Sequence, residues 1–134
     1  MQLTDNQQHV LAALQQANGP LTAYGLLDRL RAQGFNAPMQ VYRALERLAE
    51  HDLVHRLESL NAYVSCAHPG SCRHDLRAFA ICDNCGHVDE FEDANLRRCL
   101  GRWTKNNAFS LRESMIELHG ECGTCSEVRM AAGN

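Results

Sequence analysis

Two pairs of cysteines have the spacing of a closed zinc site. The pairs are Cys82-Asp-Asn-Cys85 and Cys122-Gly-Thr-Cys125, with 36 residues between them. Two thiolates on one tight turn can hold an ion at about 2.3 Å, and two such turns complete a tetrahedral Zn²⁺ site without an open position. A redox-active pair is the alternative, but neither pair opens a helix in a thioredoxin-like βαβ unit. The spacing therefore predicts a structural zinc ion.

Four further residues of ligand type lie in the middle of the chain: His55, Cys66, His74 and Glu90. Imidazole, thiolate and carboxylate groups together would suit a second Zn²⁺ ion. All four lie near the border between a cysteine-free first half and a cysteine-rich second half, which favours a shared site. On spacing alone, scattered surface residues are the simpler interpretation, so a second zinc site depends on their shared location.

The composition supports metal binding rather than disulfide bonding. The 134 residues include seven cysteines and seven histidines, and the first residues have no basic stretch typical of a secretory signal. An odd number of cysteines without such a signal favours thiols kept reduced, so we expect a cytoplasmic protein. No apolar run is long enough for a membrane span. The net charge of −3 argues against indiscriminate nucleic-acid binding but permits a local basic face.

The distribution of cysteines also predicts the domain organisation. Residues 1–65 contain no cysteine, and the segment that follows includes Pro69-Gly70, which interrupts regular structure. We therefore expect a first domain over residues 1–65, a linker over 66–76 and a zinc-binding domain over 77–134.

The first domain is predicted to contain three helices and a hairpin. Thr22 can cap the second helix, Gly34 can end it, and Pro38 suits the first turn of the third. At helical spacing, the predicted buried positions are Val10, Leu11, Leu14, Leu26, Leu27, Leu30, Val41, Leu45 and Leu48. Two strands, near 53–58 and 62–65, follow. This order is typical of a winged helix-turn-helix, whose recognition helix enters the DNA major groove. Its five arginines face six acidic residues, so DNA binding would require the arginines to gather on one face.

The second domain is predicted to be a small α/β unit, which makes the fold class α+β. Strands are expected near 78–81, 87–91 and 111–119, with a helix capped by Asp93 between the last two. The expected core includes the helix stripe and one strand face: Leu96, Cys99, Leu100, Trp103, Ile116 and Leu118. Such a small sheet has an open edge and little core, so dimerisation through the sheet would protect both.

Runs from both halves resemble the ferric uptake regulator superfamily, most closely its zinc uptake regulator branch. They are LTAYGLLDRLR (21–31), VYRALERL (41–48), VHRLESLNAYVSC (54–66), ICDNCGHVDE (81–90) and IELHGECGTC (116–125). The resemblance covers nearly the whole chain. It implies a bacterial, homodimeric, metal-dependent repressor with an N-terminal winged helix and a C-terminal α/β dimerisation domain.

Site residues are carried over from the family by position. The structural zinc falls on the four cysteines of the two pairs. The regulatory zinc falls on His55, Cys66 and Glu90, with His74 as the fourth ligand and Asp75 or His68 as alternatives. Tyr24 and Arg43 would contact base edges, and Gln40 and Tyr42 would lie near the DNA backbone. The resemblance thus implies one structural and one regulatory zinc ion per chain.

Three departures from the family pattern limit this assignment. The opening Leu-Thr-Pro-Gln-Arg reads Leu3-Thr-Asp-Asn-Gln7 here, so the first helix lacks a basic residue. We expect no counterpart of the extra N-terminal helix that many members have. Arg97 stands where some members have a metal-binding carboxylate, so His119 is expected to be a hydrogen-bonded structural histidine.

The sequence therefore predicts a zinc-responsive repressor that binds operator DNA of zinc-uptake genes, without a membrane or small-molecule partner. The alternative is a zinc-stapled interaction module without metal-regulated DNA binding. An enzyme is not expected. His119-Gly-Glu121 beside Cys122 mimics a nucleobase-deaminase motif, but those enzymes separate the two parts and keep a coordination position open for water.

Overall fold

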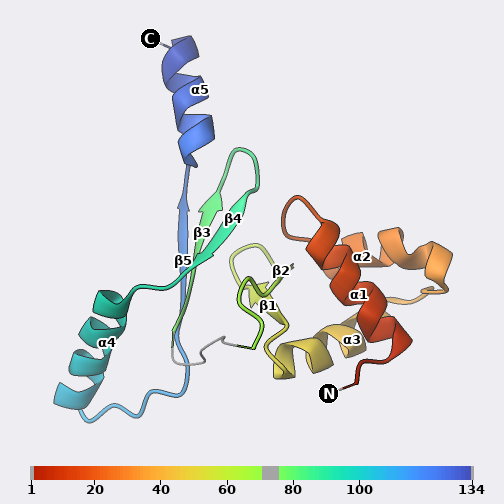
Figure 1. Cartoon of the computed structure of the whole chain (residues 1–134), viewed down its shortest axis with the longest axis horizontal. Helices are drawn as coiled ribbons and strands as arrows, with labels where there is room; N and C mark the ends of the chain where they lie inside the picture. Colours follow the sequence, from red (N-terminus) through yellow and green to blue (C-terminus); the bar gives the residue numbers. More distant parts are fainter. Residues whose placement is uncertain (1, 71–75, 134) are drawn as a thin grey trace. The chain divides into compact units, whose positions relative to one another are not determined.

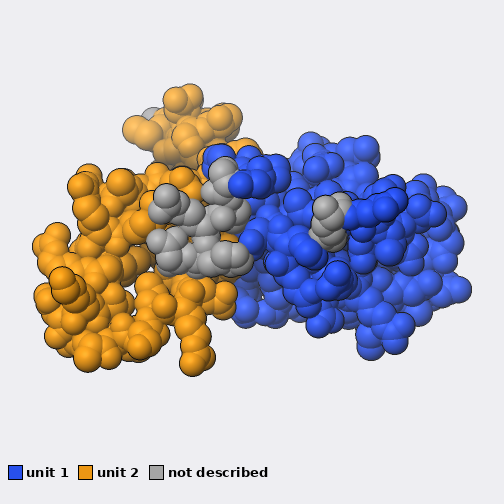
Figure 2. All heavy atoms as spheres, turned by 60° about the horizontal axis from the view of Figure 1, so that its bottom comes forward, with its two compact units in different colours: residues 1–72 blue, residues 73–134 orange. Residues whose placement is uncertain are grey.

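The computed structural model describes residues 2–70 and 76–133 and contains two compact units. Unit 1 comprises residues 1–72 and unit 2 comprises residues 73–134 (Figure 2). None of the described helices is long and apolar enough to cross a membrane.

Unit 1 is a winged helix (Figure 1). Its elements are α1 (Asp5–Gln16), α2 (Ala23–Leu30), a 3₁₀ turn (Arg31–Gln33), α3 (Pro38–Glu50), β1 (Val54–Leu57) and β2 (Ala62–Ser65). Local chemistry fixes their starts. The Oγ1 of Thr22 accepts a hydrogen bond from the Gly25 N–H at 3.0 Å, and Pro38 occupies the first turn of α3. Gly34 ends the 3₁₀ turn with a φ of 95°, a conformation that favours glycine.

The core of unit 1 joins all three helices to the hairpin. The predicted stripes are confirmed, with Leu11 only half-buried; the buried positions are Val10, Leu14, Leu26, Leu27, Leu30, Val41, Leu45 and Leu48. Strands β1 and β2 pair antiparallel, with His55 opposite Val64. Leu21 and Tyr63 exchange two backbone hydrogen bonds of 3.0 and 2.8 Å, which attach the hairpin to the chain before α2.

Unit 2 is a three-stranded sheet with two helices (Figure 1). Its elements are β3 (Arg77–Cys82), β4 (Val88–Phe91), α4 (Ala94–Asn106), β5 (Met115–Gly120) and α5 (Gly123–Gly133). The strand order is β4-β3-β5, with β3 antiparallel to β4 and parallel to β5. Parallel pairing requires a crossover, which β4 and α4 provide. Asp93 caps α4 as predicted, since its carboxylate accepts from the Asn95 and Leu96 N–H groups at 2.8 and 3.1 Å.

None of the six predicted core residues of unit 2 is fully buried in the single chain: Leu96, Leu100 and Ile116 are half-buried, and the other three are exposed. Leu118 is 51% exposed, Trp103 is 57% exposed and Cys99 is exposed. The physical reason is that, among the described residues, α4 makes no extensive contact with any strand, so its apolar stripe and the exposed positions of β5 lack a covering layer.

Helix α5 was not predicted, and it shows that the second cysteine pair, Cys122 to Cys125, does open a helix. The pair nevertheless belongs to a four-cysteine cluster, and among the described residues no strand follows α5 to complete a thioredoxin-like βαβ unit.

Candidate functional site

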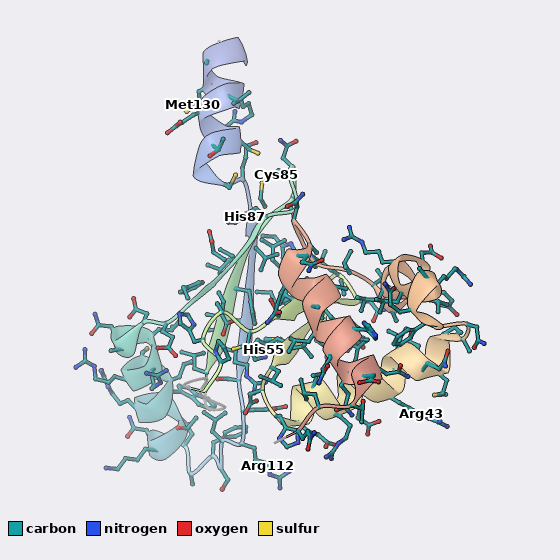
Figure 3. The ribbon with its side chains drawn as sticks, turned by 45° about the vertical axis from the view of Figure 1, so that its right-hand side comes forward. Arg43, His55, Cys85, His87, Arg112 and Met130 are labelled. Atoms are coloured by element: carbon teal, nitrogen blue, oxygen red, sulfur yellow. The ribbon has the colours of Figure 1, made fainter. Side chains whose placement is uncertain are left out.

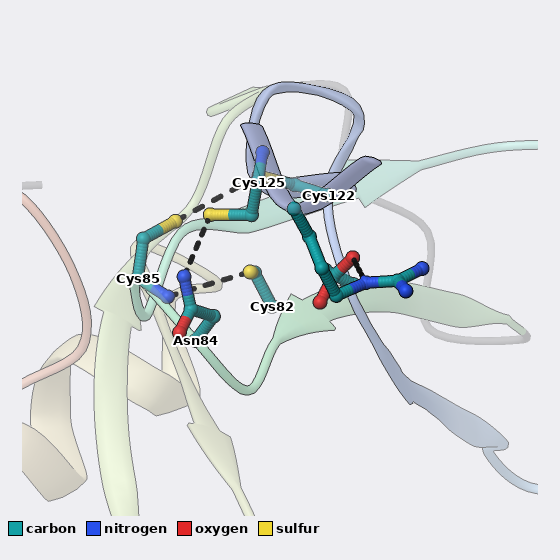
Figure 4. A network of polar contacts seen from close by, with 7 residues as sticks. Cys82, Asn84, Cys85, Cys122 and Cys125 are labelled. Carbon is teal, nitrogen blue, oxygen red and sulfur yellow. Dashed lines mark hydrogen bonds and ion pairs between the residues drawn. The ribbon is translucent and has the colours of Figure 1, made fainter. Parts of the chain in front are cut away.

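The sheet topology brings the four predicted cysteines together. Strand β3 ends at Cys82, opposite Gly120 at the end of β5. Because β3 and β5 are parallel, the two cysteine pairs follow the same edge of the sheet. All four sulfur atoms lie within 4.8 Å of one another, and the Sγ atoms of Cys85 and Cys122 are 3.8 Å apart (Figure 4).

Each pair forms a tight turn whose backbone points at its own first sulfur. The N–H of Cys85 lies 3.4 Å from the Sγ of Cys82, and the N–H of Cys125 lies 3.4 Å from the Sγ of Cys122. Gly86 completes the first turn with a φ of 81°. These donors stabilise negative charge on sulfur, which is the form that binds a metal.

Asn84 links the two turns, although the sequence did not predict this role. Its Nδ2 donates a hydrogen bond of 3.2 Å to the Sγ of Cys125, which belongs to the second cysteine pair (Figure 4). The sequence shows only that an amide side chain lies between two ligand cysteines. It does not show that this amide donates to Cys125 of the other pair.

The surroundings give the thiols very different pKa values. Backbone hydrogen bonds from Cys122 and Cys85 lower the pKa of Cys82 to about 6. For Cys125, the hydrogen bond from Asn84 lowers the pKa, but neighbouring thiols and burial outweigh it and raise the value to about 12. The pKa of Cys85 is also raised, because its neighbouring thiols and burial outweigh a backbone hydrogen bond from His87. A cation would favour the thiolate form of all four, and four convergent sulfurs fit Zn²⁺ in a closed tetrahedral site.

A second pair of ligand residues lies within unit 1. His55 on β1 is 2% exposed and Cys66, directly after β2, is 8% exposed. Their ligand atoms lie within 4.8 Å of each other. The Cys66 N–H donates to the Leu53 carbonyl at 2.8 Å, which fixes the residue beside β1. A buried imidazole beside a buried thiol is an uncommon pairing in an apolar core and suits a metal.

The other predicted regulatory ligands lie in different parts of the chain. Glu90 lies on β4 in unit 2, half-buried and opposite Phe79. His74 and its alternative Asp75 lie outside the described residues, as does Cys72. His68 is exposed, and its backbone N–H lies 3.4 Å from the Sγ of Cys66.

His119 is hydrogen-bonded as predicted, with its Nδ1 3.1 Å from the Oδ1 of Asp83.

The predicted DNA contacts lie on the surface of unit 1. Arg43 is exposed on α3, and its side chain extends away from the helix (Figure 3). Tyr42 is 40% exposed and Tyr24, on α2, is 63% exposed. Gln40 has a structural role, because its Oε1 accepts from the N–H groups of Asn36 and Ala37 at 2.8 and 3.1 Å. These bonds cap the start of α3.

Several known proteins are similar to this chain in sequence and in structure. Residues 1–119 match the ferric uptake regulator family. The zinc uptake regulation protein of Escherichia coli (strain K12) is 38% identical over 129 residues, which are 96% of this chain and 75% of that protein. A structure of a zinc uptake regulator complexed with zinc and DNA is 37% identical, with a TM-score of 0.90 over 97% of this chain and 87% of the other. The holo form of XcZur is 38% identical, with a TM-score of 0.85 over 95% of this chain and 88% of the other. This chain therefore belongs to the ferric uptake regulator family.

Proposed function

We propose that this chain is a homodimeric, zinc-responsive transcriptional repressor that binds operator DNA of zinc-uptake genes when a regulatory zinc site is filled. The observation that carries the proposal is the coexistence of a winged helix with two separate groups of zinc-type ligands. The likeness to a regulator complexed with zinc and DNA supports it.

The four cysteines would hold the structural zinc ion. Unit 2 has a small sheet with few buried side chains, so cross-linking the end of β3 to the start of α5 would stabilise it. Because the ligand set is closed and purely thiolate, this ion would be retained and would not report changes in zinc supply.

The regulatory zinc ion would bind His55 and Cys66, with Glu90 as the third ligand and His74 as the fourth. His55 and Cys66 belong to unit 1 and Glu90 to unit 2, so an ion that takes all three favours one placement of the two units. In a homodimer this placement sets the spacing of the recognition helices, which must be about 34 Å to read two half-sites on one face of DNA. Linkage then requires that DNA tightens zinc by the factor by which zinc tightens DNA.

The recognition helix would be α3. Arg43 is exposed and can pair with the O6 and N7 atoms of guanine, and Tyr24 on α2 and Tyr42 on α3 also present exposed rings. Cancelling the negative charge of the Cys66 thiolate and the Glu90 carboxylate would also lower repulsion from phosphate.

The family match also bears on whether this chain is an enzyme and on where it acts. The family is one of transcription regulators, and we infer that this chain has no catalytic activity and acts in the cytoplasm, where its DNA lies. The closed cysteine cluster suits binding rather than turnover, because four thiolates leave no coordination position open for a reactant.

A mobility shift on promoter DNA of zinc-uptake genes, over a series of buffered free zinc concentrations, tests the proposal. Wild type should bind only above a threshold of zinc, Cys66→Ser should lose this response, and Cys99→Ser, an exposed cysteine outside both groups, should keep it. Zinc-independent binding by wild type would remove the regulatory role. One zinc ion per chain and no DNA binding would favour the alternative of a zinc-stapled interaction module.

A further inference from the structure

Helix α4 has two opposite faces of different chemistry. Leu96, Leu100 and Trp103 follow one another at helical spacing and form its apolar stripe. Arg98, Arg102 and Lys105 repeat the same spacing two residues later, which places them about 200° around the helix axis. All three cationic residues are exposed. We call these three residues the cationic face of α4.

Among the described residues, no acidic side chain pairs with the cationic face of α4. The helix contains no aspartate or glutamate. Within the described part of the chain, no carboxylate forms an ion pair with Arg98, Arg102 or Lys105, and Arg98 donates only to the amide oxygen of Asn95. Exposed cations gathered without partners repel one another and favour an anionic ligand.

Three arginines of unit 1, by contrast, are paired with carboxylates. Arg31 pairs with Asp28 at 3.3 Å, Arg47 with Glu50 at 2.9 Å and Arg56 with Glu58 at 2.7 Å. These three pairs occupy most of the five arginines of unit 1, where six acidic residues outnumber them. Unit 1 therefore offers little positive charge for phosphate, although phosphate contacts supply much of the affinity of proteins for DNA.

We propose that the cationic face of α4 binds the phosphate backbone of duplex DNA and supplements the contacts of the winged helix. The proposal rests on the proposed function, since it assumes that the repressor binds DNA. The contacts would be independent of sequence, because Arg and Lys on phosphate read charge and not bases. The apolar stripe lies on the opposite side of α4 and stays available for packing.

The test is the salt dependence of DNA binding by the full-length, zinc-loaded protein. The probes are a fluorescein-labelled random-sequence duplex and a labelled zinc-uptake promoter, titrated between about 50 and 200 mM salt. The variants are Arg102→Gln, the triple variant Arg98→Gln/Arg102→Gln/Lys105→Gln, and Arg129→Gln as the control. Arg129→Gln removes one positive charge, as Arg102→Gln does. It serves as the control because Arg129 is paired with Glu121 at 2.8 Å and lies outside the cationic face of α4.

We expect both α4 variants to weaken binding to both probes and to flatten the plot of log affinity against log salt. The slope should fall by about 0.9 for each phosphate group that the variant no longer neutralises. The control should keep the wild-type slope. Zinc content and mass by sedimentation should equal those of wild type in every variant.

Two results would overturn the inference while leaving the proposed function intact. One is a wild-type slope in the triple variant. The other is an altered dimer mass with unchanged DNA binding, which would assign the face to an acidic surface of a second copy. If wild type with zinc binds neither probe, the proposed function fails, and the inference fails with it.

Discussion

The Nδ2 of Asn84 lies 3.2 Å from the Sγ of Cys125, although the two residues are 41 positions apart in the sequence. Asn84 lies inside the first cysteine turn, and Cys125 closes the second. The amide therefore stabilises charge on a sulfur atom of the opposite turn and holds the two turns together. Groups that position metal ligands in this way affect metal retention without touching the metal.

Replacing Asn84 by alanine should speed zinc release from the cysteine site. Loss of an outer hydrogen bond typically lowers metal affinity by about 10- to 100-fold, and we expect the lower end because the bond is exposed. Zinc transfer to a chromogenic chelator measures the rate. Asn95→Ala, which removes an exposed amide of the same unit, should match wild type, and equal rates for both variants would contradict the role of Asn84.

Substituting one cysteine of the cluster should remove one zinc ion and destabilise unit 2. Cys82→Ser breaks the closed ligand set, whereas Cys99→Ser changes an exposed thiol outside it. Elemental analysis should find one zinc fewer per chain only in Cys82→Ser, whose thermal unfolding should begin at lower temperature. A wild-type zinc content in Cys82→Ser would exclude the cluster as the structural site.

Zinc uptake by the cysteine cluster should release at least two protons at about pH 7.5, since metal-binding thiols must be deprotonated. The pKa values of Cys85 and Cys125 are raised, the latter to about 12, so both carry protons before zinc arrives. The pKa of Cys82 is lowered to about 6, so its proton competes with zinc only below that pH. Affinity should therefore rise with pH. Calorimetry in two buffers of different ionisation enthalpy counts the protons, and fewer than two would contradict the raised values.

Replacing Arg43 by glutamine should weaken operator binding by about 1–3 kcal/mol, the typical value of one bidentate contact to guanine. Binding to random-sequence DNA should change much less, because a base contact contributes little there. Arg47→Gln on the same helix is the control, since Arg47 is paired with Glu50 at 2.9 Å. Fluorescence anisotropy with both duplexes measures the two affinities. An equal loss on both would reassign Arg43 to phosphate.

Leu118→Glu should dissociate the homodimer. Leu118 is 51% exposed on the edge strand β5, and a buried carboxylate at an interface would be costly. We expect the dimer dissociation constant to rise about 30-fold or more, equivalent to about 2 kcal/mol. Sedimentation velocity measures the change. Leu60→Glu, at a 38% exposed position in the turn of the hairpin, should leave the dimer intact, and a stable dimer in Leu118→Glu would move the interface elsewhere.

Local signals were sufficient to predict unit 1. Thr22 as a cap, Pro38 in a first turn and leucines at helical spacing are each read within one element, and the structure confirms them. The cysteine cluster was also predictable, because a CxxC turn is a local motif and two of them suggest one ion.

Unit 2 was harder to predict because its burial does not follow from periodicity. Leu118 and Trp103 have the spacing of core residues, yet both are exposed in the part of the chain that the structure describes. Asn84 was missed because its acceptor belongs to a distant turn. The role of Glu90 depends on the other unit, so the regulatory ligand set stays a prediction.

The parallel pairing of β3 with β5 has a consequence for biosynthesis. Cys82 and Cys85 leave the ribosome well before Cys122 and Cys125, with 36 residues between the pairs. At about 5–20 residues per second, the nascent chain exposes two reactive thiols for about 2 to 8 seconds before their partners exist. Zinc capture by all four thiols must therefore wait until the second pair has emerged, and oxidation of the first pair during this interval would prevent correct maturation.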